Sequence, residues 1–132
     1  MSKFMKLTAI SLLLIFVACS KSKPDQIATI KSPTDGVFYT VETFEGHGAI
    51  DNDYTRVYLH MERSGESAKA LVLSGTYVTV SKVAWINATE NTIYIDGGFT
   101  STFCNQVTLR AGGVTETFHA YLQENRATPK AQ

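Results

Sequence analysis

Hydrophobic and polar side chains alternate with a period of two along most of residues 35–124. In residues 54–61 the alternation places three apolar side chains on one side of an extended strand, Val57, Leu59 and Met61, and three others on the opposite side, Arg56, Tyr58 and His60. This pattern predicts a strand with one core face and one solvent face. Similar stretches, rich in β-branched and aromatic residues, predict further strands at residues 37–44, 68–74, 77–86, 92–95, 102–110 and 114–122.

Short polar and glycine-rich segments separate these strands. Ser64-Gly65-Glu66 and residues 87–91 predict turns, and Gly75 predicts a strand break. Ala111-Gly112-Gly113 predicts a hairpin, because glycine readily adopts the positive φ that a tight two-residue loop requires. Residues 35–124 show no helical period, so the fold class is all-β. Seven or eight short antiparallel strands favour a single small β-sandwich or barrel.

The N-terminal segment has the pattern of a signal peptide. Lys3 and Lys6 precede twelve uncharged residues, 7–18. A membrane-spanning helix needs about 20 apolar residues, so this run is short for a permanent span. It ends at Phe16-Val17-Ala18-Cys19, which resembles the lipobox of bacterial lipoproteins, with Phe16 where that family usually has Leu or Val. The resemblance implies that residues 1–18 are removed and that Cys19 is acylated.

The resemblance also implies a location. Acyl chains on Cys19 would hold the protein to the lipid bilayer, because each buried methylene contributes about 0.8 kcal/mol. Ser20, rather than Asp, resembles the family's pattern for export to the outer membrane, facing the periplasm, if the host is Gram-negative. Polar, turn-prone composition predicts that residues 19–34 are the lipidated Cys and a flexible tether and that residues 125–132 are a polar tail. The β domain is then residues 35–124.

The charge distribution limits the classes of partner. Twelve Lys and Arg balance twelve Asp and Glu, so no global positive field exists to bind nucleic acid. Residues 34–125 alone hold eleven acidic and five basic side chains, a net charge of −6. Such a charge can steer a cationic protein partner, although solubility explains it equally well.

One loop carries candidate metal chemistry. His47, Asp51 and Asp53 fall within seven residues, and imidazole with two carboxylates is a plausible ligand set. A calcium loop of the EF-hand type is excluded, because Arg56 stands where that loop needs its glycine. We therefore favour solvated carboxylates in a turn and predict no metal. His60 and His119 are predicted to lie on outer strand faces rather than to act as ligands.

Known catalytic signatures are absent from the sequence, and we predict neither a catalytic residue nor a cofactor. With Cys19 acylated, Cys104 has no intramolecular disulfide partner. Cys104 lies in a strand-like stretch and is predicted to be a small buried hydrophobic residue. Trp85 is predicted to be either a core residue or an anchor for a partner, since Trp is enriched at binding hot spots.

A weak internal similarity occurs at an offset of fifty residues, where Gly48, Val57 and Leu59 align with Gly98, Val107 and Leu109. It is the pattern of two duplicated halves with their glycine-rich loops at one end, and chance explains it equally well. The favoured functional hypothesis is a membrane-anchored, non-catalytic module that binds a protein partner, with His47, Asp51, Asp53 and Trp85 as candidate binding residues. The alternative is a metal-dependent ligand binder or enzyme that uses the loop from His47 to Asp53.

Overall fold

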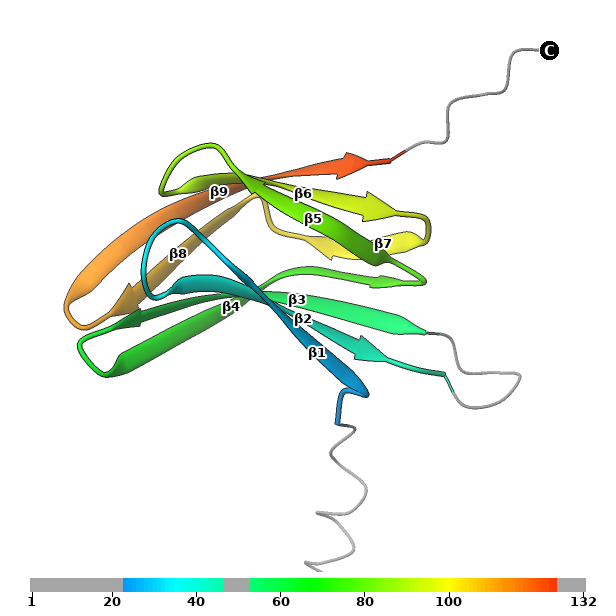
Figure 1. Cartoon of the computed structure of the whole chain (residues 1–132), viewed down its shortest axis with the longest axis horizontal. Coiled ribbons are helices and arrows are strands. Elements are labelled where there is room, and N and C mark those ends of the chain that lie inside the picture. Colours follow the sequence, from blue (N-terminus) through cyan, green and yellow to red (C-terminus); the bar gives the residue numbers. More distant parts are fainter. Residues whose placement is uncertain (1–22, 47–52, 126–132) are drawn as a thin grey trace, which may run out of the picture.

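A computed structural model describes residues 23–46 and 53–125. Within these ranges the chain forms nine strands and no helix, and the strands lie in two stacked sheets that do not close into a barrel (Figure 1). The all-β prediction is confirmed, with a sandwich rather than a barrel. The same residues hold no helix of the length and hydropathy that a membrane crossing requires. The predicted signal peptide, Cys19 and most of the polar tail lie outside the described residues.

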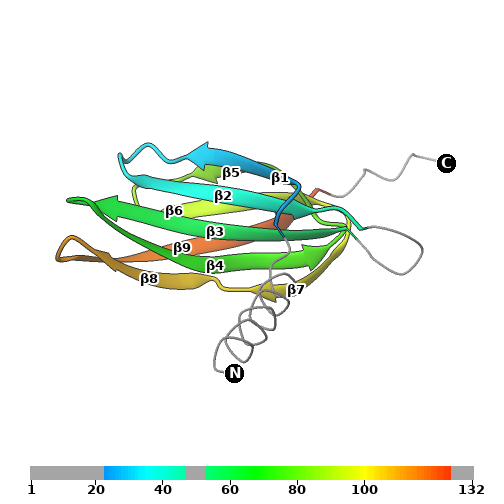
Figure 2. The same cartoon turned by 90° about the horizontal axis from the view of Figure 1, so that it is seen from below.

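Sheet A contains five strands in the order β1-β2-β3-β4-β7, and sheet B contains four in the order β5-β6-β9-β8. The strands of sheet A are β1 (Gln26–Lys31), β2 (Val37–Phe44), β3 (Tyr54–Arg63), β4 (Glu66–Thr76) and β7 (Phe99–Phe103). Those of sheet B are β5 (Thr79–Trp85), β6 (Glu90–Asp96), β8 (Gln106–Ala111) and β9 (Val114–Glu124). Viewed from below, β1 and β5 lie along one side of the sandwich and β7 and β8 along the other (Figure 2).

Strand β1 corrects the predicted boundary between tether and domain. It lies inside the segment predicted as a flexible tether, and it pairs with β2 from Gln26↔Thr43 to Lys31↔Phe38. Ile30 packs against the core. The prolines and lysines around this strand made it resemble a linker, whereas pairing with β2 satisfies its backbone and brings Ile30 to the core.

Two further predictions about the strands are wrong. Strands β6 and β9 pair in parallel, from Glu90↔His119 to Ile95↔Glu124, so sheet B is mixed rather than antiparallel. Residues 102–110 do not form one strand, because β7 ends at Phe103 and the chain crosses to sheet B before β8 begins at Gln106.

Gly75 does not end its strand as predicted. Strand β4 continues to Thr76, and its register with β7 shifts between Ser74 and Gly75. A Cβ at Gly75 would lie 2.6 Å from both the Phe99 carbonyl oxygen and a Val78 methyl group. The glycine therefore permits a close backbone approach at a bulge.

The core lies between the two sheets. Val57, Leu59 and Met61 are fully buried, which confirms the inner face predicted for this strand. Tyr39 of β2 is also fully buried, and its hydroxyl donates a 2.9 Å hydrogen bond to Asn91 Oδ1 of β6. Burial raises the pKa of Tyr39 to about 12, against the lowering effect of the Asn91 hydrogen bond. One polar contact therefore joins the sheets through the core.

Two tight hairpins confirm two of the predicted turns. Ser64 and Gly65 connect β3 to β4 with φ values of 50° and 79°, and Gly112 and Gly113 connect β8 to β9 with φ values of 57° and 76°. Positive φ at both loop residues matches the twist of the flanking strands. The Gly112 N–H donates to Glu66 Oε2 at 2.8 Å, so the two hairpins meet.

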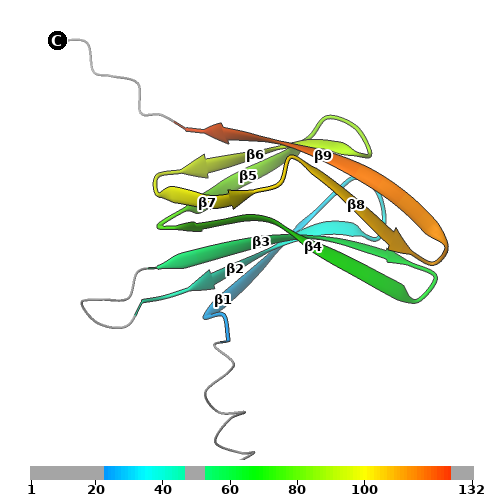
Figure 3. The same cartoon turned by 180° about the vertical axis from the view of Figure 1, so that it is seen from behind.

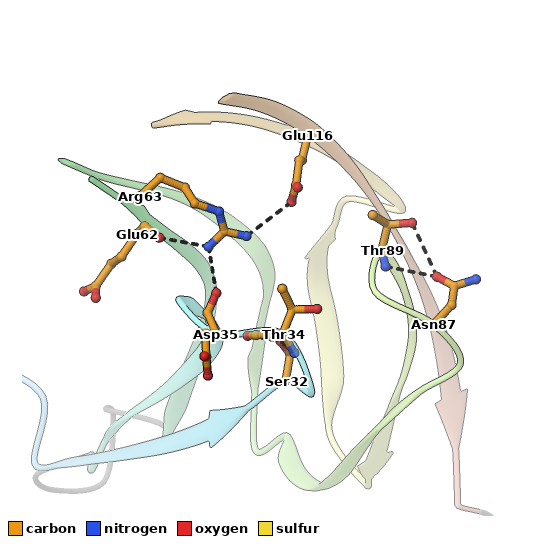
Figure 4. Close-up of polar contacts among 8 residues, drawn as sticks. All are labelled: Ser32, Thr34, Asp35, Glu62, Arg63, Asn87, Thr89 and Glu116. Atoms are coloured by element: carbon orange, nitrogen blue, oxygen red, sulfur yellow. Dashed lines mark hydrogen bonds and ion pairs between the residues drawn. The ribbon is translucent and has the colours of Figure 1, made fainter. Parts of the chain in front are cut away.

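Arg63 links the two sheets at the end of the sandwich where these two hairpins meet. Its Nη1 donates to the carbonyl oxygens of Asp35 at 2.7 Å and Glu62 at 2.9 Å, and its Nη2 lies 3.7 Å from Glu116 Oε2 on β9 (Figure 4). These four residues form the Arg63 cluster. The loop from β1 to β2, strand β3 and sheet B are therefore held by one guanidinium group.

The internal similarity is not a structural repeat. Strand β3, with Val57 and Leu59, is the centre of sheet A, whereas β8, with Val107 and Leu109, is an edge of sheet B. The described residues of the two glycine-rich loops nevertheless lie at the same end of the domain. The Tyr77 N–H donates to the Asp53 carbonyl at 3.0 Å, and a Cβ on Gly98 would lie 2.6 Å from the Tyr77 carbonyl oxygen.

Candidate functional site

Of the three polar residues predicted between β2 and β3, the structure describes Asp53. His47 and Asp51 lie outside the described residues. The Asp53 side chain is exposed, and its Oδ1 accepts a 2.9 Å hydrogen bond from the Gly46 N–H. Asp53 thus joins the end of β3 to the residues that follow β2. No group of three or more His, Cys, Asp or Glu side chains in residues 23–46 and 53–125 could hold a metal ion.

Trp85 lies at the end of β5, partly buried against the core. Its ring centroid is 5.8 Å from that of Tyr39, with the two planes tilted by 40°. Its Nε1 atom is buried and makes no protein hydrogen bond. Of the two roles predicted for Trp85, the structure supports core packing, and the residue is separate from the surface described below.

Cys104 lies in the crossover between the sheets rather than in the predicted strand. Cys104 is partly buried, and its backbone N–H donates a hydrogen bond to the Val72 carbonyl oxygen at 2.8 Å. Its backbone therefore extends the contact between β4 and the end of β7. The partial burial agrees with a packing role more than with full enclosure in the core.

The most distinctive surface of the described residues is the outer side of sheet A. Here β2 and β3 present an aromatic face, which we define as Phe38, Phe44, Tyr54, Tyr58 and His60. All five side chains are half-buried, and they alternate with the inward-facing residues of the same strands. The register places Phe38 beside His60 at one end of this face and Phe44 beside Tyr54 at the other, with Thr40 opposite Tyr58 and Glu42 opposite Arg56 between them.

Cationic side chains cover part of this face. The guanidinium carbon of Arg56 lies 5.2 Å from the Phe44 centroid and 5.5 Å from the Tyr54 centroid. Lys69, from β4, places its Nζ 4.9 Å from the Tyr58 centroid. Each distance is within the range of a cation–π contact, so the rings and cations restrain each other.

His60 is held firmly within the face. Its ring stacks on Phe38 with centroids 4.7 Å apart and planes 6° apart, and its Nε2 lies 2.7 Å from Thr40 Oγ1. Burial, followed by the charge of Lys69, lowers the pKa of His60, while Glu62 and Glu42 act in the opposite direction. The imidazole is therefore biased toward its neutral form, in which it stacks on Phe38.

The Tyr54 hydroxyl has a pKa below its ordinary value. Hydrogen bonding from Ser74 is the largest cause that lowers the pKa of Tyr54, with burial opposing it and smaller contributions from Ser101 and Arg56. These partners come from β3, β4 and β7. The phenol is thereby tied to three strands of sheet A.

The sequence analysis did not identify the aromatic face. Tyr58 and His60 were correctly placed on the outer side of their strand, but the pattern within one strand carries no information about its neighbours. The available signal was an aromatic residue at each end of residues 38–44. Both lie on the outer side of their strand, as Tyr54 and Tyr58 lie on the outer side of theirs. Only the pairing register shows that these rings lie side by side.

The fold and the surface define a two-sheet β-sandwich with one aromatic and cationic outer face. No protein family, curated protein or solved structure matches this chain.

Proposed function

We propose that this chain is a non-catalytic binding module of the bacterial envelope, which recognises a protein partner through the aromatic face of sheet A. The observation that carries the proposal is the set of half-buried rings on one face of β2 and β3, with Arg56 and Lys69 over them. Aromatic residues and Arg are enriched where proteins bind one another. In this proposal the lipobox-like Cys19 anchors the module to the outer membrane, facing the periplasm.

The geometry favours binding with little conformational cost. Strands β2 and β3 are interior strands of sheet A, each paired on both sides. The rings are held by stacking, by cross-strand pairing and by the cations, so few rotamers remain to be ordered when a partner binds. Preorganisation of this kind increases affinity by reducing the entropy lost on association.

The predicted loop residues can extend this surface. Phe44 ends β2 and Tyr54 begins β3, so the connection that carries His47 and Asp51 starts and finishes at this end of the aromatic face. Asp53 is exposed beside Tyr54. Acidic groups next to Arg56 would give a partner both signs of charge to recognise, and opposite charges set orientation more than affinity.

The experiment is affinity capture from the native envelope with the full chain as bait, comparing the wild type with the Arg56→Gln variant. Arg56 contacts two rings of the face, and the variant should lose most of the captured partner while the chain remains folded. The matched control is Arg110→Gln, an exposed arginine on sheet B, which should capture the partner normally. Equal capture by all three proteins would contradict the proposed surface.

Anchoring requires its own experiment. Mass spectrometry of the mature wild-type protein should find an acylated Cys19 at the new N-terminus, and Cys19→Ser should abolish the modification. An unmodified Cys19 or an intact residue 1–18 segment would overturn the lipoprotein proposal and leave the binding surface unaffected. For the metal-dependent alternative, EDTA should lower the melting temperature and divalent ions should restore it.

A further inference from the structure

The four edge strands of the sandwich are not equally protected against pairing with another chain. In two of them the ladder is interrupted: β5 shifts register between Val80 and Lys82, and β7 pairs across a shift beside Gly75. Strand β8 packs over β4 and β3 of the other sheet (Figure 3). Strand β1 pairs with β2 in unbroken register over six residues. Neither a register shift nor packing like that of β8 protects its outer edge from another chain.

The backbone of β1 presents regularly spaced hydrogen-bonding groups to this edge. The Ser32 N–H donates to the Val37 carbonyl at 3.0 Å. Because bonded and non-bonded pairs alternate in an antiparallel ladder, the even-numbered residues of β1 bond to β2. The N–H and C=O groups of Ile27, Thr29 and Lys31 therefore point away from the sheet. Ile27 also exposes 61% of its side chain, although it is apolar.

We propose that β1 pairs in antiparallel fashion with β1 of a second copy of this chain, with Thr29 on the twofold axis. This register places Ala28 opposite Ile30 of the partner subunit, a small side chain opposite a large one, on the inner side of the sheet. On the outer side it places Ile27 opposite Lys31 of the partner subunit. The same pairs occur twice, as a twofold interface requires.

Charge complementarity supports this occupant and this register. Ile27 lies beside Glu42 in the register of β1 with β2. Lys31 of the partner subunit would therefore extend its aliphatic stem over Ile27 and bring its ammonium group toward Glu42. The exposed Ile27 would be covered, and one ion pair would form on each side of the axis.

A groove beside β1 supports the same arrangement. It has a volume of about 300 Å³ and lies between the sheets, with Ala28 and Val41 on one side and Val78 and Val80 on the other. Ile30 packs toward the core in its own subunit, which fixes the side of the sheet to which even-numbered residues point. Ile30 of the partner subunit, opposite Ala28, would point toward this groove and cover part of its apolar wall.

The interface would join two copies of sheet A into one ten-stranded sheet, with both aromatic faces on the same side. Two copies of one surface raise the avidity for a repetitive partner without any new contact. The pairing of β1 stands independently of the proposed function, because none of its residues belongs to the aromatic face.

The test is disulfide cross-linking of the full chain in its own membrane, with Cys104→Ser as background. In the proposed register the two Thr29 Cα atoms lie about 5.5 Å apart, which is within the range that a disulfide bridges. Thr29→Cys should therefore form a covalent dimer on mild oxidation. Ile27→Cys and Lys31→Cys should each remain monomeric alone and should cross-link when the two variants are co-expressed.

The matched control is Thr79→Cys, an exposed threonine on the edge strand β5, which should remain monomeric. Three results would overturn the proposal: no dimer from Thr29→Cys, equal dimer from Thr79→Cys, or cross-linking of Thr29→Cys only to a different protein. Thr29→Pro adds a second measurement. It removes an N–H that β2 does not use, so the fold should persist while light scattering shows half the mass of the wild-type particle.

Discussion

The two outer faces of the sandwich arise from the same alternating pattern but carry different chemistry. On sheet A, rings from β2 and β3 meet in cross-strand pairs, and two cations cover them. On sheet B, the cross-strand pair is polar: Thr108 and Thr117 lie opposite each other with their hydroxyl oxygens 2.9 Å apart. Tyr94, with Lys82 4.6 Å from its centroid, and the exposed Tyr121 have no stacked ring partner among the described residues.

The comparison teaches that pairing register, rather than the aromatic content of a single strand, creates the aromatic face. Tyr58 and Tyr94 have nearly the same environment, each with one lysine above its ring. They differ in their neighbours, because Tyr58 lies two residues before His60, whose ring stacks on Phe38, on a face that also carries the Phe44 and Tyr54 pair. The protein therefore contains its own control for any experiment on the aromatic face.

Replacement of the shared core should have the largest effect and should remove both faces together. Phe118 is 1% exposed, and Phe118→Ala should lower the free energy of unfolding by about 3–5 kcal/mol through lost burial and a cavity. Urea denaturation measures this loss. The control Tyr121→Ala, on the same strand but 53% exposed, should change stability by about 0.5 kcal/mol or less. A loss of about 0.5 kcal/mol or less for Phe118→Ala would contradict the description of the core.

Disruption of the Arg63 cluster should have an intermediate effect and should test whether the two faces are mechanically linked. Arg63→Gln removes both carbonyl hydrogen bonds and the contact with Glu116, and it should cost about 1–3 kcal/mol. Thermal unfolding of Arg63→Gln beside the exposed Arg110→Gln checks this expectation. Equal melting temperatures for the two variants would show that the cluster does not stabilise the sandwich.

The pH dependence of His60 should be the smallest effect, and it belongs to sheet A alone. Burial and Lys69 lower the pKa of His60 in the folded state, so the unfolded chain binds the proton more readily. The stabilisation should be complete above the unfolded pKa of about 6.5 and should decline as pH falls through that value toward the lower folded pKa. Unfolding measured between about pH 5 and 8 should show a shallower decline for His60→Gln than for the wild type. Identical slopes for the two proteins would argue against the stacked, neutral imidazole.

Local sequence signals predicted the elements whose information is local. The alternation in residues 54–61 identified β3 and its buried face, and the pair Gly112-Gly113 identified the last hairpin because few other residues adopt positive φ twice in succession. Strand β1 was missed for the opposite reason. Its alternation is weak, and its stability depends on pairing with β2 rather than on its own composition.

Topology and the candidate surface depended on distant residues. Nothing near Cys104 in the sequence marks a change of sheet, since neither glycine nor proline separates β7 from β8. The parallel pairing of β6 with β9 joins segments more than twenty residues apart, and alternation is the same for parallel and antiparallel neighbours. The aromatic face could not be assembled from the sequence for the same reason, because it exists only in the register of β2 with β3.

The most direct test of the central claim is the matched pair Tyr58→Ala and Tyr94→Ala, measured for affinity toward the captured partner. Both variants remove one half-buried tyrosine that carries a lysine contact, so their costs to the fold should be similar. We expect Tyr58→Ala to weaken binding by about 2 kcal/mol, roughly thirtyfold, and Tyr94→Ala to leave it unchanged. Equal loss in both variants, or loss only with Tyr94→Ala, would contradict the assignment of the aromatic face as the binding surface.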